Sequence, residues 1–312
     1  MLIKILQNSA VQTAVILVMV VGVGMCVLPE HLPERLRFIE QFVPQIMMGY
    51  LFAGLLFLIL RQPRLLFASF GCCAALAIYL KPTENISEEN NAVKIKIAHF
   101  SLSDAGDDAE FALSKILETN ADLISVQEVT PDWQFILEEK LDTLYPYFHT
   151  VMDLSMHSVS VFSKHEFNFI DTFNYKDIPN LTGMISIGED YKESVQFVCA
   201  YPQPAFNQTD YDEVREHLNL IQERLKNFRN PHFVIGNFYM VPWSKEVQAF
   251  RRDTGLEDSR TYHPTGALSF FDIPLDHIFH SKNLKCNSFD NVDGKNSTHL
   301  GIQGTYELKY VE

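Results

Sequence analysis

The chain has 312 residues, 47% of them hydrophobic, so it is long enough for one sizeable domain and a further segment. Its formal net charge is −14. Residues 1–82 hold six Lys/Arg and three Asp/Glu, which leaves about −17 on residues 83–312. Proteins bind nucleic acid largely by neutralising phosphates with Lys and Arg, so this balance argues against nucleic acid as a partner.

Three apolar runs occupy the first 80 residues. They cover residues 9–28, 43–60 and 65–80. The first two are close to the roughly 20 residues that a bilayer-spanning helix needs, and the third is shorter but follows after a tight basic turn. A cleaved signal peptide would explain the first run, but that run is long for a signal sequence and two more follow it. Residues 1–80 are therefore predicted to be a membrane anchor of three transmembrane helices, with the lipid bilayer as one partner.

The basic residues of this segment bear on its orientation. Arg61 and Arg64 stand in a four-residue turn between the second and third runs, whereas Arg35, Arg37 and Lys81 would lie on the other side. The positive-inside rule nearly cancels over the whole anchor, but two arginines in so short a turn favour a cytoplasmic turn. With three spans, the C-terminal domain is then expected outside the cytoplasm.

The five cysteines show no metal-binding spacing. Cys26, Cys72 and Cys73 fall in the apolar runs, and Cys199 and Cys286 belong to the rest of the chain. The last two could pair in an oxidising compartment, but Cys199 stands in a strand-like run and is predicted to be a buried free thiol.

Strand and helix signals alternate beyond a polar, acidic linker at residues 81–92, KPTENISEENNA. A half-buried strand is predicted at 93–100, and further strands are predicted at 123–126, 158–163, 194–200 and 233–236. Such alternation predicts an α/β domain over residues 93–312.

The sequence also predicts where several helices begin. Thr130 followed by Pro131 is typical of an N-cap and first helical residue, and Ser244 is a second N-cap candidate. A longer helix is predicted over 210–228. Four apolar residues share one face of it, namely Val214, Leu218, Ile221 and Leu225.

Several motifs occur in an order that resembles the endonuclease/exonuclease/phosphatase superfamily, over about residues 93–311. Residues 122–129, DLISVQEV, match a D-x-x-x-x-Q-E pattern whose glutamate, here Glu128, is a metal ligand of that family. Residues 275–278, LDHI, match an aspartate-histidine motif of the family. Residues 297–299, STH, resemble a separate Ser-Asp-His motif of the family and retain the histidine of that motif. Trp133 and residues 145–147 resemble its membrane-anchored bacterial branch. The resemblance implies a four-layer α/β sandwich preceded by a small bundle of transmembrane helices, and a place in the bacterial inner membrane.

The same motifs depart from the family pattern at the residues that carry chemistry. Ser101 stands for an asparagine, Tyr201 for a phosphate-contacting histidine, and Asn237 for the aspartate that acts as base. Tyr239 replaces a further asparagine, and Thr298 replaces a second aspartate. Both tyrosines are bulkier than the residues they replace, so they are expected to fill the cleft.

In addition to Glu128, two residues match the residue types of the family motifs, and these are Asp276 and His299. They are the residual catalytic positions that the resemblance implies, either as an orienting carboxylate–imidazole pair or as a buried pair that ties two strands together. Hydrolysis of a phosphodiester needs a carboxylate-bound divalent cation and a base near the attacking water, and an asparagine cannot take up a proton. Glu128 alone provides too few ligands for a divalent cation, so weak metal binding or none is expected.

The sequence therefore predicts a catalytically inactive, membrane-anchored member of this superfamily. Its expected role is that of an interaction or accessory subunit, with a protein partner in a membrane complex and no cofactor. Two alternatives stay open. One is an active phosphodiesterase or phosphatase with an atypical site that uses Mg or Mn. The other is a sensor that binds a phosphorylated ligand without cleaving it.

Overall fold

The structure is a computed structural model that describes residues 8–80, 93–105, 108–153, 157–188, 192–260, 273–295 and 298–309. The predicted linker at 81–92 lies outside these residues. The chain divides into two compact units, one helical and N-terminal and the other α/β, and each is described by itself.

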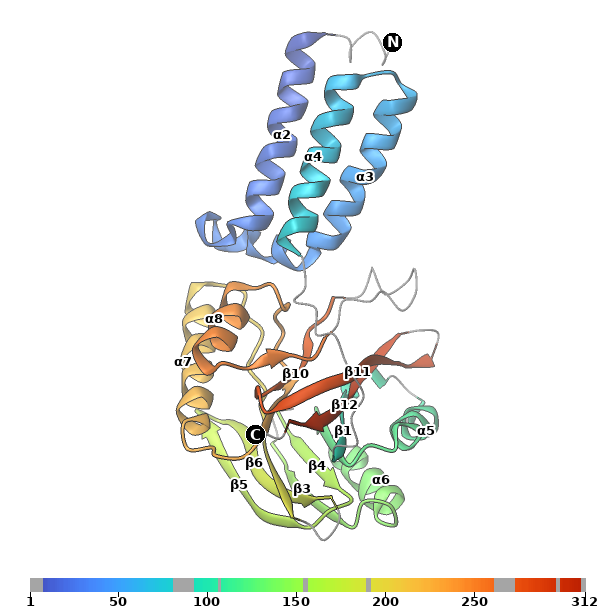
Figure 1. Cartoon of the computed structure of the whole chain (residues 1–312), viewed down its shortest axis with the longest axis vertical. Helices are drawn as coiled ribbons and strands as arrows, with labels where there is room; N and C mark the ends of the chain where they lie inside the picture. The colour runs from blue at the N-terminus through green and yellow to red at the C-terminus, as the bar shows by residue number, and fades with distance from the viewer. Residues whose placement is uncertain are drawn as a thin grey trace. The chain divides into compact units, whose positions relative to one another are not determined.

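Among its described residues, the N-terminal unit contains three α-helices, which Figure 1 labels. They are α2 (Ser9–Val27), α3 (Val43–Ile59) and α4 (Pro63–Tyr79), with 3-10 segments at Pro29–His31 and Glu34–Phe42 between the first two. Polar contacts join them. Gln12 Nε2 donates to Gln62 Oε1 at 2.9 Å, the Tyr50 hydroxyl donates to the Met19 carbonyl at 2.9 Å, and the Ser69 hydroxyl donates to the Tyr50 carbonyl at 2.7 Å.

Two stretches of this unit, Ser9–Val27 and Leu36–Ile59, are long and apolar enough to cross a membrane, and Pro63–Tyr79 is apolar but shorter. Length and composition make them candidate spans, or, for the stretch nearest the N-terminus, a signal sequence. The count of three spans and the orientation stay predictions.

The α/β unit contains two six-stranded sheets. The first has the order β11-β12-β1-β2-β4-β3 and the second has the order β5-β6-β7-β8-β10-β9. The strands of the first sheet are β1 (Lys94–Ser101), β2 (Leu123–Gln127), β3 (Tyr147–Val151), β4 (Val159–Ser163), β11 (Leu284–Asp293) and β12 (His299–Leu308). Those of the second are β5 (Phe167–Tyr175), β6 (Ile178–Ile187), β7 (Glu193–Cys199), β8 (His232–Asn237), β9 (Glu257–Asp258) and β10 (Asp276–His280).

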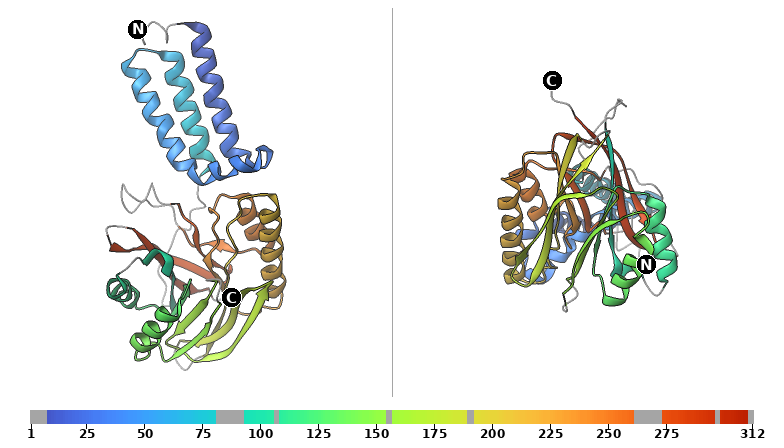
Figure 2. Two further views of the ribbon diagram at one scale, coloured as in Figure 1. Left: turned by 180° about the vertical axis from the view of Figure 1, so that it is seen from behind. Right: turned by 90° about the horizontal axis from the view of Figure 1, so that it is seen from below.

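In the part of the domain that the structure describes, four helices flank the sheets, and a short 3-10 segment follows β1 at Leu102–Ala105. The helices are α5 (Ala109–Thr119), α6 (Pro131–Leu141), α7 (Gln208–Leu225) and α8 (Lys245–Thr254). The sheets face one another, with α5 and α6 outside the first and α7 and α8 outside the second (Figures 1 and 2). Three apolar cores fill the three interfaces: one between the sheets and one under each helical layer. This is the predicted four-layer α/β sandwich.

Local signals predicted several of these elements correctly. The Thr130 side chain accepts a hydrogen bond from the Trp133 N–H, and Ser244 accepts one from Val247, so both predicted N-caps are confirmed. The apolar face of α7 is buried as expected, although the helix runs from 208 to 225 rather than from 210 to 228. Cys199 and Cys286 are free and buried.

One strand differs from its predicted pattern. The alternation at 93–100 predicts a half-buried strand, but β1 is buried without interruption from Ile97 to Ser101. It lies between β12 and β2, and while Ile95 and Ile97 belong to the core between the sheets, Ala98 and Phe100 belong to the core under α5 and α6. A central strand covered on both faces has no polar side to display.

Candidate functional site

The predicted site residues lie at the ends of six strands, at one end of the sandwich. Strand β1 runs parallel to β2, and β7 runs parallel to β8, whereas β10 and β12 run antiparallel to β8 and β1. The carboxyl ends of the first four strands therefore meet the amino ends of the other two. These ends carry Ser101, Glu128, Tyr201, Asn237, Tyr239, Asp276 and His299.

Glu128 is held by two tyrosines. Its Oε1 accepts hydrogen bonds from the hydroxyls of Tyr201 and Tyr239, each at 2.5 Å, and the two hydroxyl oxygens lie 3.0 Å apart. The Glu128 side chain is buried, with 6% of its surface exposed, and Tyr201 has the same exposure. Glu128 Oε2 is buried without a hydrogen-bond partner among the described residues. The tyrosine pair thus covers the carboxylate.

The electrostatics keep the Tyr201 phenol neutral. Burial raises the pKa of Tyr201 far above its ordinary value, and the hydrogen bond to Glu128 makes the second-largest contribution to this increase. Tyr201 is therefore a hydrogen-bond donor rather than a phenolate. A phenol in that state is a poor ligand for a cation and a good partner for a carboxylate.

The backbone around Glu128 is constrained as well. Both Glu128 and Tyr239 have left-handed backbones, with φ of 60° and 51°. Non-glycine residues rarely adopt this conformation, and such residues cluster at functional sites. The sequence alone offers no sign of it, since neither residue is a glycine.

Asn237 forms hydrogen bonds with the backbone of Tyr239 and with residues of the other sheet. Its Oδ1 accepts the Tyr239 N–H at 2.9 Å, and its Nδ2 lies 3.5 Å from the Ser101 hydroxyl. Its own N–H donates to Gln127 Oε1 at 2.8 Å, and Gln127 Nε2 donates to the Ala200 carbonyl at 2.8 Å. Asn237 and Ser101 thus link the two sheets, and Gln127 is the centre of that link. The sequence pattern contains this glutamine, but it was not predicted as a site residue.

Asp276 and His299 form the predicted pair. His299 Nε2 lies 2.7 Å from Asp276 Oδ2 across the sandwich, and 27% of the His299 side chain is exposed. Burial alone would raise the pKa of Asp276, but the hydrogen bond to His299 and the nearby His99 hold it below its ordinary value. This pair retains the geometry for orienting an imidazole, and it also ties β10 to β12.

A second histidine lies on the other carboxylate oxygen. His99 Nε2 is 3.7 Å from Asp276 Oδ1, and His99 Nδ1 is 3.2 Å from the Ser125 hydroxyl. His99 has no exposed surface, and burial lowers its pKa, with Asp276 only partly offsetting this effect. No ligand spacing in the sequence points to His99, so a structural or surface role is predicted for it. The structure assigns it a buried position against a predicted site residue.

His157 also lies near the site, although no spacing pointed to it. Its Nδ1 is 3.1 Å from Asp153 Oδ2, its Nε2 is 2.8 Å from Gln203 Nε2, and its ring centroid is 5.6 Å from that of Tyr201. Gln203 follows Tyr201 by two residues, and this proximity in sequence was the one available signal. Thr298 is different. It is exposed, and its hydroxyl donates to the Lys295 carbonyl in a turn.

These donors do not fit a carboxylate-bound divalent cation. Mg²⁺ prefers carboxylate oxygens and retained waters. Oε1 of Glu128 already receives two hydroxyl donors, and the oxygens of Asp276 face His99 and His299. Among the described residues, no three His, Cys, Asp or Glu are grouped as a metal site. Glu128 Oε2 is one buried carboxylate oxygen, which is too little for such an ion.

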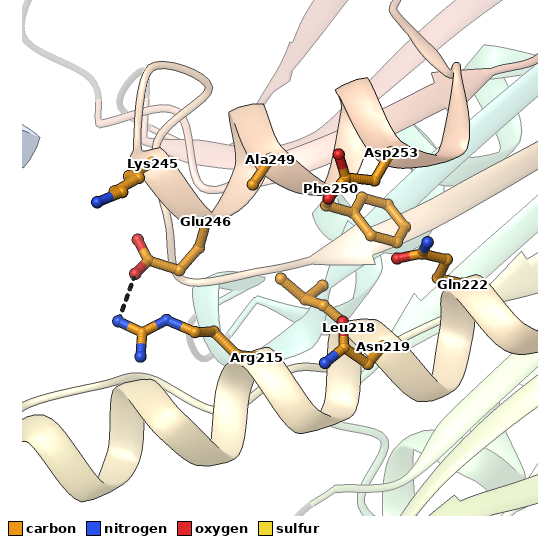
Figure 3. Close-up of a pocket in the computed structure, with 9 residues that line it drawn as sticks. All are labelled: Arg215, Leu218, Asn219, Gln222, Lys245, Glu246, Ala249, Phe250 and Asp253. Carbon is orange, nitrogen blue, oxygen red and sulfur yellow. Dashed lines mark hydrogen bonds and ion pairs between the residues drawn. The ribbon is translucent and has the colours of Figure 1, made fainter.

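Among the described residues, two of the hollows lie away from this site. A groove of about 300 Å³ separates α7 from α8, with Arg215 and Glu246 paired at 3.2 Å at one end and with Leu218 and Phe250 between the two helices (Figure 3). A second hollow of about 360 Å³ lies beside Arg251, Arg252 and Lys282. Neither is lined by a residue that the sequence assigned to the site.

The comparisons with known proteins agree with the fold and the motif order. The sequence model of the endonuclease/exonuclease/phosphatase family matches residues 102–299. A search of curated proteins gave no significant match.

Solved structures share the fold at low identity. An endonuclease/exonuclease/phosphatase from Beutenbergia cavernae has 14% identity and a TM-score of 0.56, over 70% of this chain and 72% of that one. A humanised D. rerio TDP2 has 12% identity and a TM-score of 0.54, over 69% and 99% of the two chains. A Bacteroides vulgatus endonuclease/exonuclease/phosphatase has 15% identity and a TM-score of 0.53, over 69% and 99%. The chain belongs to the endonuclease/exonuclease/phosphatase family.

Proposed function

We propose that this protein is a membrane-anchored, catalytically inactive member of its family, and that it serves as an interaction or accessory subunit of a membrane complex. The observation that carries the proposal is the pair of 2.5 Å hydrogen bonds that Tyr201 and Tyr239 donate to Glu128. A cation at this carboxylate would have to displace both hydroxyls from a buried position.

The chemistry of the other positions supports the same proposal. Asn237 cannot act as a base, and its amide oxygen accepts the Tyr239 N–H. Loss of a general base typically costs about 10²–10⁴-fold in rate. Loss of an electrostatic donor, here the histidine that Tyr201 replaces, typically costs about 10²–10³-fold. Together these losses should leave little of the hydrolytic activity of a family enzyme.

The candidate spans support the anchored half of the proposal. We place the protein in a bacterial inner membrane, with the lipid bilayer and a protein partner as its contacts and with the α/β domain outside the cytoplasm. A short tether keeps such a domain close to neighbouring membrane proteins and raises their effective concentration. The charge of about −17 on residues 83–312 makes nucleic acid a poor partner.

One observation favours a second candidate function, an atypical phosphodiesterase. Asp276 and His299 keep a 2.7 Å contact, and the His299 imidazole reaches solvent. That pair could still move a proton to or from a bound ester. Such an enzyme would have to act without the cation site that the family uses, or would have to open the tyrosine pair first.

The deciding experiment measures hydrolysis of a generic phosphodiester by the full chain in detergent, with Mg²⁺ or Mn²⁺ and with EDTA. We expect no metal-stimulated rate above that of a Glu128→Ala variant prepared in parallel. Co-purification of partners from native membranes gives the second readout. Glu128→Gln and His299→Ala should leave any association unchanged, whereas removal of residues 1–80 should weaken it. A robust metal-dependent rate that Glu128→Ala abolishes would establish the phosphodiesterase instead.

A further inference from the structure

The two sheets end in four edge strands, which are β11 and β3 in the first sheet and β5 and β9 in the second. An edge strand presents unpaired N–H and C=O groups that can pair with another chain. Natural proteins therefore protect their edges with charges, prolines, bulges or very short strands.

Three of these edges carry such protection. Strand β9 has two residues, both acidic. Strand β5 has a register irregularity between Phe167 and Phe169, and its Asp171 pairs with Arg224 at 3.1 Å. Strand β11 has two irregularities and carries Lys285, Asp290 and Asp293. Each device disfavours the addition of a further strand.

Strand β3 has none of these features. Its sequence, Tyr147-Phe148-His149-Thr150-Val151, contains no Asp, Glu, Lys, Arg or proline, and its register with β4 is regular over all five residues. Tyr147 is 37% exposed and Phe148 is 41% exposed, while Leu144 and Met152 beside the strand are 40% and 38% exposed. On an acidic domain, this strand at the end of the first sheet is neutral and largely apolar; Figure 1 labels it.

We propose that β3 pairs with β3 of a second copy of this chain, antiparallel and about a two-fold axis. In the register that pairs all five residues, His149 lies opposite His149 of the second copy. Tyr147 then lies opposite Val151, and Phe148 lies opposite Thr150. Aromatic side chains opposite β-branched ones are favourable cross-strand pairs. The strand is therefore complementary to itself, as a two-fold interface requires.

Charge limits where a second copy can bind. Two domains of about −17 repel one another, and this repulsion is smallest where the surfaces that meet carry no carboxylates. In the proposed register, Asp153 lies opposite Tyr145, so no carboxylate faces a carboxylate at this edge. A five-residue strand is short for the roughly 1,200–2,000 Å² of a stable interface, so we expect a concentration-dependent dimer. The pairing needs neither the inactivity nor the anchoring proposed above.

A cysteine at the two-fold axis tests the register. Residues directly opposite one another in an antiparallel pair have Cα atoms about 4.5–5.5 Å apart, which is within disulfide range. The full-length His149→Cys variant in detergent should form a covalent dimer under mild oxidation. Thr172→Cys on edge β5 is the matched control, and the unsubstituted chain reports the background from the native cysteines.

A second variant tests the association itself. Thr150→Lys places a charge on the edge at a half-buried position, and it should remain folded by circular dichroism. Sedimentation should show the unsubstituted chain moving from monomer to dimer with concentration, whereas Thr150→Lys should stay monomeric. Equal cross-linking of His149→Cys and Thr172→Cys would overturn the proposal, because it would indicate random collision. A monomer at all concentrations without cross-linking at 149, or a dimer that Thr150→Lys does not weaken, would also overturn it.

Discussion

Glu128 and Tyr239 are joined by a 2.5 Å hydrogen bond, although each has a left-handed backbone that non-glycine residues rarely adopt. The bond joins the end of β2 in one sheet to the loop after β8 in the other. Residues in such conformations cost of order 1–3 kcal/mol each and persist where the surroundings fix them. Here both backbone N–H groups are also bonded, that of Glu128 to the Ser158 carbonyl and that of Tyr239 to Asn237 Oδ1. With the hydroxyl bond to the carboxylate, these contacts hold the two conformations, and Glu128 connects the two sheets.

We expect the tyrosine hydroxyls to stabilise the fold. Tyr201→Phe and Tyr239→Phe each remove one donor from the buried Glu128 carboxylate, and hydrogen bonds to charged groups contribute about 1.5–3 kcal/mol. Each variant should lower the free energy of unfolding by about that amount, and the double variant should lose more than the sum, because the carboxylate then has neither donor. Tyr175→Phe, which removes an exposed 2.9 Å bond to Glu216, should cost about 0.5 kcal/mol or less. Equal losses for all three single variants in denaturant titrations would contradict this role.

Divalent cations should not stabilise the chain. A ligand that binds only the native state raises the melting temperature in proportion to its binding free energy. Because two hydroxyls cover Glu128 Oε1, Mg²⁺ and Mn²⁺ should leave the melting temperature equal to that in EDTA. A cation-dependent increase that disappears in Glu128→Gln would show that the carboxylate binds metal despite the tyrosines. An increase that persists in this variant would point to a cation elsewhere on the acidic surface.

The sequence predicted a set of candidate site residues but not the contacts that they make. Glu128, Asp276 and His299 were found because their motifs are local and keep the family order. The hydrogen bonds of Tyr201 and Tyr239 depend on segments 73 and 111 residues away from Glu128, and no local pattern encodes such distances. His99 was missed for the same reason, since its partner Asp276 comes from the other sheet.

Secondary structure shows the same limit. Buried strands such as β2 and β8 and the capped start of α6 carry strong local signals, and they were predicted to within one or two residues. Strands β5 and β6 were not predicted, because a long antiparallel pair with a mixed sequence lacks a clean period of two. The burial of β1 on both faces follows from its place between β12 and β2, which its own sequence does not specify.

Gly236 should be intolerant of a side chain. A Cβ at this position would lie 1.9 Å from the Ala200 carbonyl oxygen, in the parallel pair of β7 and β8 beside the Gln127 link. Gly236→Ala should therefore destabilise the domain by more than about 4 kcal/mol or prevent folding. Gly255→Asn is the control. Gly255 has a φ of 72°, a Cβ added there would have no neighbour within 4 Å, and asparagine adopts this conformation readily. Similar losses of soluble folded protein for both variants would refute the steric argument.

Stability should fall in mild acid because of buried histidines. Burial lowers the pKa of His217 to about 3 and that of His277 to about 4, from an ordinary 6.5. Both stay neutral in the folded chain while the unfolded chain takes up protons below about pH 6.5, so stability is fully present above that pH. It should decrease as the pH falls from 6.5 towards 4. His217→Gln, which keeps a polar group near Asn180, should reduce this slope in urea titrations at several pH values. An unchanged slope would mean that other groups set the acid response.

The orientation of the anchor can be tested with two introduced cysteines. Arg61 and Arg64 favour a cytoplasmic turn between α3 and α4, and the hydroxyl of Ser9, at the start of α2, lies 3.4 Å from Arg64 Nη1, so both belong to one end of the helical unit. Ser9→Cys should therefore react with a membrane-impermeant maleimide only after the inner membrane is permeabilised. Ser114→Cys, exposed on α5, should react before that step. Four of the five native cysteines are buried and Cys73 is partly buried, so the unsubstituted chain sets a low background. The reverse pattern would place the domain in the cytoplasm, and reaction of both sites without permeabilisation would contradict an anchor that crosses the membrane three times.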